Sequence, residues 1–264
     1  MATSETASFI PVPAGELCAS QRGAAPRAVF IHGFSGDLHT WDGVWAELGD
    51  ALPALRYDLR GFGRSRGEEG VSFDHAEDLA AVLDAAGIHN ADLVGVSLGG
   101  GIAINFALDH PERARRLVLI SPGLVAWEWS EAWRSLWRPI VERARAGAMD
   151  EARRLWWQHP LFTSTRESAA APQLRDTIMR YSGAQWLGDH HRPRLPDVER
   201  LHRLDAPALL LTGERDLADF RLIATLLEAS APRLTRIDHA GLGHLLHLED
   251  PAACAGELLR FLTA

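Results

Sequence analysis

A pentapeptide around Ser97 constrains the fold of this chain more than any other part of the sequence. Residues 91–96 form a short apolar run, and Gly95-Val96-Ser97-Leu98-Gly99 leads from it into an apolar stretch over residues 98–109. Gly-x-Ser-x-Gly between a strand and a helix is typical of a sharp turn that exposes a nucleophilic serine. Free N–H groups and the helix dipole favour negative charge there. A Gly-rich turn with a helix-capping serine is the alternative interpretation, but the strand-helix context favours the nucleophile.

Strands and helices are expected to alternate along most of the chain, because short apolar runs that end in turn residues predict buried strands. These runs cover residues 28–31, 55–58, 91–96, 116–120, 208–212 and 234–238, after an edge strand or hairpin within 8–20. Helices are expected over residues 74–86, 98–109, 218–230 and 251–263. The alternation predicts an α/β fold, with a mostly parallel twisted sheet and helices on both of its faces.

Residues 124–196 interrupt this alternation. They have helical periodicity and no strand pattern, and they hold seven of the nine tryptophans. An insertion of this size must pack on something, and the C-terminal edge of the sheet, where open α/β folds bind ligands, is the obvious surface. We therefore expect a first part of the core over 1–123, a helical Trp-rich cap over 124–196 inserted after the sixth strand, and a second part of the core over 197–264.

A catalytic acid is expected after the strand at residues 208–212. Gly213-Glu214-Arg215-Asp216 follows that strand, and Asp216 stands between the strand and a helix. An Asp in this position would also serve as a helix N-cap, and Glu214 is a nearby competitor. We predict that Asp216 is the acid of a triad.

A catalytic base is expected after the strand at 234–238, in Gly241-Leu242-Gly243-His244. The base must reach the serine hydroxyl with one ring nitrogen and the carboxylate with the other, and the glycines let this loop turn over the sheet edge. His239 and His247 are the alternatives. We predict His244, because Ser97, Asp216 and His244 then follow one of the known chain orders of such triads.

The oxyanion of an acyl-transfer reaction needs two N–H donors. The backbone N–H of Leu98, directly after the serine, is one candidate. The backbone N–H of Phe34 is the other, because His32-Gly33-Phe34 directly follows the strand at 28–31. For His32 itself we expect a structural role in holding this loop.

Taken together, these motifs resemble the α/β-hydrolase superfamily over nearly the whole chain. The matching pieces are Ile31-His32-Gly33-Phe34, Tyr57-Asp58-Leu59-Arg60-Gly61-Phe62-Gly63-Arg64-Ser65, Gly95-Val96-Ser97-Leu98-Gly99-Gly100, Gly213-Glu214-Arg215-Asp216 and Gly243-His244. The resemblance implies a nucleophilic serine, an acyl-enzyme and a mobile lid. It does not imply one substrate, because this fold carries many chemistries.

The expected function is hydrolysis of a carboxylic ester or lactone with an apolar or aromatic group. Tryptophans bury large apolar areas and can still donate one hydrogen bond, so a Trp-rich cap suits such a substrate. Although most of the tryptophans are expected to form the cap's own core, four aromatic residues are candidates for binding the substrate: Trp127, Trp156, Trp157 and Phe162.

Thioester substrates and transfer of the acyl group to an alcohol stay open for the same triad, and three other functions are alternatives. His32-Gly33-Phe34-Ser35-Gly36, Trp157-Gln158-x-Pro-x-Phe and Gly213-Glu214-Arg215-Asp216 are similar to the menaquinone-pathway pyruvate-eliminating synthase, a lyase with the same fold and triad. That family usually has an Arg shortly after the elbow glycines, where this chain has Gly101 and Ile102. The other two are hydrolysis of a carbon–carbon bond in a ring-cleavage diketone and a non-enzymatic ligand sensor.

Composition argues against several other functions. A formal net charge of −8 with scattered arginines argues against nucleic-acid binding. The two cysteines have no zinc-site spacing, and neither a metal nor an organic cofactor is expected. No apolar run is long enough to span a membrane. The N-terminal residues 1–8 lack the basic and apolar regions of a secretory signal, so a cytoplasmic location is expected. The partner is expected to be a small ester-like molecule, and the oligomeric state stays open.

Overall fold

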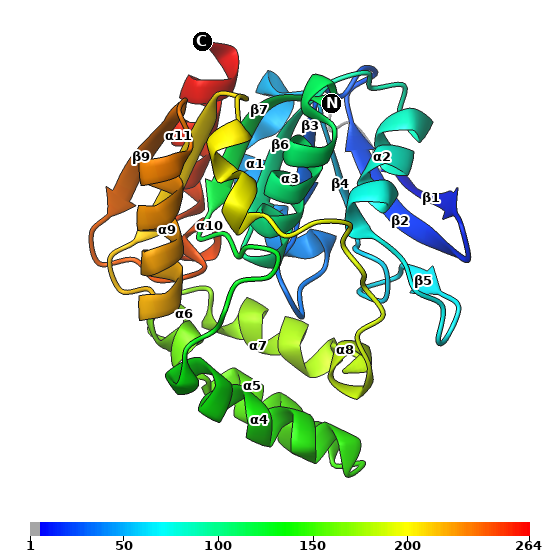
Figure 1. Cartoon of the computed structure of the whole chain (residues 1–264), viewed down its shortest axis with the longest axis vertical. Helices are drawn as coiled ribbons and strands as arrows, with labels where there is room; N and C mark the ends of the chain where they lie inside the picture. Colours follow the sequence, from blue (N-terminus) through cyan, green and yellow to red (C-terminus); the bar gives the residue numbers. More distant parts are fainter. Residues whose placement is uncertain (1–5) are drawn as a thin grey trace.

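The computed structural model describes residues 6–264, which fold around one nine-stranded sheet (Figure 1). The strand order is β1-β2-β4-β3-β6-β7-β8-β9, and β5 pairs with β2. All pairs of β2 are antiparallel, whereas every pair from β4 to β9 is parallel, which confirms the predicted mostly parallel sheet. The strands are β1 Thr6–Val12, β2 Gly15–Arg22, β3 Ala28–Ile31, β4 Ala54–Tyr57, β5 Arg66–Gly67, β6 Ala91–Val96, β7 Ala114–Ile120, β8 Ala208–Gly213 and β9 Leu234–His239.

The N-terminal strands complete the antiparallel edge of the sheet. β1 and β2 form a hairpin, which was one of the two arrangements expected for residues 8–20. The two-residue β5 was not expected from the sequence. The insertion predicted after the sixth strand consequently follows the strand labelled β7.

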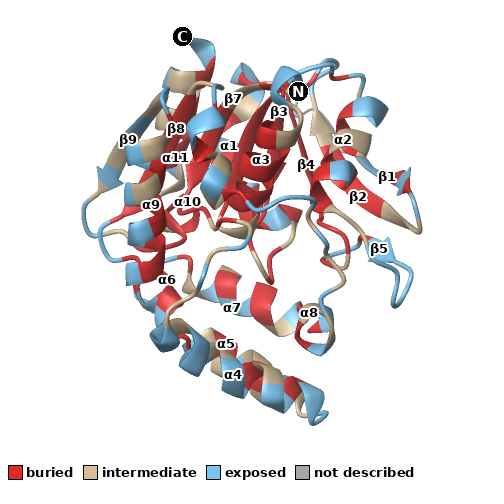
Figure 2. Ribbon diagram, viewed as in Figure 1, coloured by how far each residue is buried: buried red, intermediate tan, exposed pale blue. Residues whose placement is uncertain are grey.

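Helices cover both faces of the sheet, as the alternating pattern predicted (Figure 1). Helices α1 and α11 pack against each other on one face, and α2, α3 and α9 lie on the other. Residues 99–108 of α3 are all buried, as Figure 2 shows, because the helix lies between the sheet and its neighbours. The helices of the core are α1 Asp42–Leu48, α2 His75–Ala85, α3 Leu98–Asp109, α9 Ala218–Ser230, α10 Leu246–Glu249 and α11 Pro251–Thr263.

The segment between β7 and β8 forms a layer of helices over the C-terminal ends of the strands (Figure 1). Helix α4 packs against α5, and α5 packs against α7. Figure 2 shows that the outer side of this layer is largely exposed while its inner side is buried. The layer contains α4 Glu131–Arg145, α5 Met149–Gln158, α6 Thr163–Arg166, α7 Ala171–Arg180 and α8 Ala184–Leu187. We refer to residues 124–196 as the cap.

Three carboxylates fasten the cap to the core. Asp219 of α9 accepts hydrogen bonds from the backbone N–H and the hydroxyl of Ser130, with N···O and O···O distances of 2.9 and 2.6 Å. Asp197 accepts from the backbone N–H of Val125 at 3.0 Å. The third carboxylate, Glu249 of α10, accepts from the hydroxyl of Ser164 in α6 at 2.7 Å. Hydrogen bonds to charged groups are stronger than neutral ones, so these contacts hold the N-terminal end and the middle of the cap.

Within residues 6–264, no helix is both long and apolar enough to cross a membrane. Residues 1–5, the first part of the segment that lacks the features of a secretory signal, lie outside the described residues.

Candidate active site

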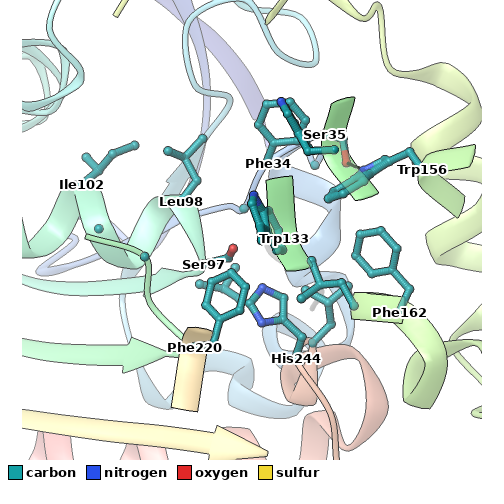
Figure 3. Close-up of a pocket in the computed structure, with 18 of the residues that line it drawn as sticks. Phe34, Ser35, Ser97, Leu98, Ile102, Trp133, Trp156, Phe162, Phe220 and His244 are labelled. Carbon is teal, nitrogen blue, oxygen red and sulfur yellow. Dashed lines mark hydrogen bonds between the residues drawn. The ribbon is translucent and has the colours of Figure 1, made fainter. Parts of the chain in front are cut away.

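Ser97 stands on a strained turn between β6 and α3. Its backbone has a φ of 53° and a ψ of −115°, a conformation that non-glycine residues rarely adopt. The turn is possible because Gly99 packs directly on the end of β3: a Cβ on Gly99 would lie 2.2 Å from the carbonyl oxygen of Ile31. The Ser97 hydroxyl consequently faces the space between the sheet edge and the cap (Figure 3).

Asp216 and His244 form a buried pair. The Nδ1 atom of His244 lies 2.9 and 3.1 Å from the two carboxylate oxygens of Asp216, and both side chains are almost fully buried. Gly213 allows this approach, because a Cβ at that position would lie 2.2 Å from the carbonyl oxygen of Gly243. The loops after β8 and β9 can therefore touch.

The structure brings Ser97 and His244 to one cavity, where Figure 3 shows the serine hydroxyl and the imidazole ring on the same wall. The Nε2 atom of His244 is buried and has no hydrogen-bond partner among the described residues. The ring of Phe220, with its centroid 4.2 Å away, packs against the imidazole. This arrangement leaves Nε2 available to accept a proton from a hydroxyl in the cavity.

Phe34 and Leu98 also line the cavity beside Ser97. Neither backbone N–H donates to another described residue, and that of Leu98 is free because Leu98 is the first residue of α3. His32 holds the loop that carries Phe34: its Nδ1 donates to the carbonyl of Gly33 at 2.8 Å, and its Nε2 accepts from the N–H of Leu59 at 2.9 Å. These two hydrogen bonds fix the loop, and the backbone N–H of Phe34 is left free to donate.

The cavity between sheet and cap has a volume of about 480 Å³. Cap tryptophans, Phe220 and aliphatic side chains supply most of its wall, and the Nε1 atom of Trp156 donates to the hydroxyl of Ser35 at 2.7 Å (Figure 3). Its lining includes Phe34, Ser35, Thr40, Ser97, Leu98, Ile102, Leu124, Trp129, Trp133, Arg134, Trp137, Trp156, Phe162, Leu174, Thr177, Asp189, His191, Phe220, His244 and His247. A cavity of this size and composition suits an organic ligand.

Two of the four aromatic residues predicted to bind substrate line this cavity, and two do not. Trp156 and Phe162 are lining residues, but Trp127 and Trp157 are not. The indole N–H of Trp127 points to Asp219 at 3.5 Å, at the fastening of the cap. Trp157 follows Trp156 in the same helix, so it projects about 100° away from it. Substrate binding by these two residues stays a prediction that this cavity does not support.

Three lining tryptophans were missed by the sequence interpretation. Trp129, Trp133 and Trp137 stand four residues apart, and their indoles form a row: Trp129 and Trp133 are stacked at 4.6 Å, and Trp133 and Trp137 at 6.3 Å. The spacing of four was the available signal, because Trp133 and Trp137 share one face of α4 and Trp129 stands just before the N-cap of this helix.

The cavity contains little charge. Arg134 is the one Arg or Lys among the described lining residues, and Asp189 is the one carboxylate. The guanidinium of Arg134 pairs with Glu131 at 3.1 Å on the exposed side of α4. Within residues 6–264, no cluster of three or more His, Cys, Asp or Glu side chains could hold a metal ion.

A buried histidine in the cap gives the fold a predictable pH dependence. His159 packs against the rings of Trp133 and Trp156, and its Nδ1 accepts from the N–H of Leu161 at 3.2 Å. Burial, with smaller contributions from the charges of His244 and Arg166, lowers the pKa of His159 from 6.5 to about 4. Between these pH values the unfolded chain binds a proton that the folded chain does not.

Stability is therefore expected to fall as the pH falls from 6.5 to about 4, with His159 contributing at most about 3 kcal/mol of this loss. His159→Asn keeps an acceptor for Leu161 but cannot titrate, so its unfolding free energy should depend less on pH over this range. Urea unfolding of both proteins at several pH values measures the difference. Parallel curves for the two would contradict this assignment.

Comparison with known proteins agrees with this architecture. The family model for the alpha/beta hydrolase fold matches residues 26–251. The chain belongs to the α/β-hydrolase family.

Among relatives of this α/β-hydrolase, a protein of Klebsiella pneumoniae named 2-succinyl-6-hydroxy-2,4-cyclohexadiene-1-carboxylate synthase is 36% identical over 252 residues, covering 90% of this chain and 94% of the relative. A solved structure of a hydrolase from Pseudomonas aeruginosa PA01 matches with a TM-score of 0.82 and 27% identity, over 98% of both chains. The enol-lactonase of Burkholderia xenovorans LB400 has the same fold, with a TM-score of 0.83 and 22% identity, over 97% of this chain and 100% of the other.

Proposed function

We propose that this α/β-hydrolase cleaves a carboxylic ester or lactone that has an apolar or aromatic group, through an acyl-enzyme on Ser97. The observation that carries the proposal is the buried pair of His244 and Asp216 beside the Ser97 hydroxyl, within a cavity walled mainly by aromatic and aliphatic side chains.

In the proposed mechanism, His244 takes the proton of Ser97 as the serine oxygen attacks the carbonyl carbon. Asp216 keeps the Nδ1 atom of His244 protonated and stabilises the imidazolium that forms. The backbone N–H groups of Phe34 and Leu98 stabilise the negative charge on the carbonyl oxygen. The leaving alcohol takes the proton from His244. Water then attacks the acyl-enzyme with His244 as the base and releases the acid.

The family resemblance gives a second candidate, the pyruvate-eliminating synthase. The Klebsiella relative bears that name at 36% identity, and its named product contains a succinyl group and a carboxylate. Substrates with several carboxylates call for several cations, whereas the described lining of this cavity has only Arg134.

Position 101 bears on this choice as well. The synthase family usually has an Arg shortly after the elbow glycines, and Gly101 stands there in this chain. A Cβ on Gly101 would lie 3.1 Å from the carbonyl oxygen of Gly123, so any side chain here needs the loop after β7 to shift by a few tenths of an ångström. These features favour an ester or lactone over the synthase substrate.

A substrate panel tests the proposal. The wild-type protein and Ser97→Ala are incubated with aryl esters, short-chain esters and lactones, and separately with the substrate of the synthase while pyruvate is measured. We expect ester or lactone turnover at least about 10³-fold above the variant, because the hydroxyl is the proposed nucleophile. Pyruvate release without turnover of any ester or lactone would instead assign the synthase reaction.

A further inference from the structure

His247 is a buried imidazole without a partner in the wall of the cavity. Its side chain is 1% exposed, and neither Nδ1 nor Nε2 has a hydrogen-bond partner among the described residues. Burying a polar group without a partner is destabilising, and native proteins pair nearly all such groups. Two unpaired nitrogens on one buried ring therefore call for an explanation.

The position of His247 indicates that a hydrogen-bond partner for its ring would come from the cavity. The residue lies in α10, which packs against the 3-10 helix Leu38–Trp41, and that helix packs against α7. The ring of Trp41, with its centroid 4.7 Å away, covers one side of the imidazole. His247 also lines the cavity, so a ligand there can contact its ring, and a turn of the ring would bring a nitrogen to that ligand.

None of the described lining residues on the 3-10 helix, α7 or α10 is Arg, Lys, Asp or Glu. Thr40 and Thr177 line the cavity from the 3-10 helix and α7, and their hydroxyls donate to the backbone carbonyls of Asp37 and Gln173, both at 2.9 Å. Their oxygens can therefore only accept from a ligand. Arg134 and Asp189, the charged lining residues, belong to α4 and to the loop after α8 instead.

The imidazole itself is neutral at neutral pH. Burial, together with a smaller effect of the charge of His244, lowers the pKa of His247 to about 3. A neutral imidazole offers one N–H donor and one nitrogen acceptor. A carboxylate would need several donors here, and a purely apolar group would leave both nitrogens unpaired.

We propose that His247 is a substrate-binding residue, and that the substrate has a neutral group that both donates and accepts hydrogen bonds, a hydroxyl or an amide, on the part that lies against α7 and α10. This inference rests on the proposed function, because it names a feature of the molecule that Ser97 would attack. It separates this substrate from a plain alkyl or aryl ester.

Matched ester pairs test the inference. One series has methyl ω-hydroxyalkanoates of increasing length, each paired with the alkanoate in which a methyl group replaces the hydroxyl. A second series has the hydroxyl on the alcohol side. In at least one series we expect the wild type to prefer the hydroxylated ester by about 10- to 100-fold in kcat/KM.

Two variants separate binding from a structural role. His247→Phe keeps a ring against Trp41 and removes both nitrogens, so the preference should fall below about threefold while the melting temperature is unchanged or higher. His247→Gln keeps a donor and an acceptor and should retain part of the preference. No preference in the wild type, or a preference that His247→Phe retains, would overturn the inference.

A binding measurement keeps this test independent of hydrolysis. If no ester or lactone is turned over, the proposed function fails, and the same pairs are titrated into Ser97→Ala by calorimetry. Tighter binding of the hydroxylated members, by about tenfold and lost in the double variant with His247→Phe, would still support the role of His247. Equal binding of both members would refute it.

Discussion

Replacing Ser97 with alanine is expected to lower kcat/KM for an ester by about 10⁴- to 10⁶-fold. The reason is that the hydroxyl would form the covalent bond to the acyl group, and no neighbouring group can take over that role. Steady-state kinetics and intact-protein mass spectrometry after a fluorophosphonate measure the two consequences. The wild type should gain the mass of one phosphonyl group, and the variant should not.

Ser121→Ala is a matched control for this experiment. Ser121 also directly follows a central strand, has a φ of 42°, and is buried with no partner for its hydroxyl among the described residues, but it does not line the cavity. Its replacement should change kcat/KM by less than about threefold, because Ser121 lies outside the cavity and has no part in the proposed reaction. Loss of activity in both variants, or in Ser121→Ala alone, would count against Ser97 as the nucleophile.

Asp216→Asn is expected to lower kcat by about 10⁴-fold with little change in KM. The carboxylate accepts the Nδ1–H of His244 at 2.9 Å, and an amide can turn its NH₂ group towards that nitrogen instead. The imidazole would then hold its proton on Nε2, where it could not accept the proton of Ser97. Kinetics on the best ester of the panel would measure the loss.

Glu214→Gln is the control for the acid, since Glu214 was the competing carboxylate in the same turn. It lies on the surface, where it accepts from the N–H of Gly241 at 3.1 Å. We expect activity within about twofold of the wild type, because an exposed neutral replacement has a small effect. If Glu214→Gln were the inactive variant and Asp216→Asn the active one, the proposed triad would be wrong.

The parallel part of the sheet was predictable because each of its strands carries a local signal. Short apolar runs mark β3, β6 and β8, each with a glycine within two residues of its end, and the proposed catalytic residues follow these ends. The pairing of His244 with Asp216 was predictable for the same reason: both follow neighbouring strands, so both reach the same edge of the sheet.

The cap was predictable as helical but not in detail. Its helices have an apolar face, yet the sequence does not say whether that face meets the sheet, another cap helix or the cavity. Trp156 and Trp157 are adjacent and chemically identical, and only the packing of α5 decides which of them faces the cavity. The unpaired nitrogens of His247 depend on contacts between distant segments, so no local pattern reveals them.

The three carboxylates that fasten the cap bear on how this enzyme chooses substrates. Ser130, Val125 and Ser164 all bind carboxylates of the core. Moving the whole cap away from the core would therefore break several charge-assisted hydrogen bonds in each catalytic cycle. Entry of a substrate through rearrangement of side chains at the rim of the cavity would break fewer of these hydrogen bonds. If the cap stays in place during turnover, the cavity discriminates by molecular size, so reaction rates across a homologous series should drop abruptly at one chain length instead of declining gradually.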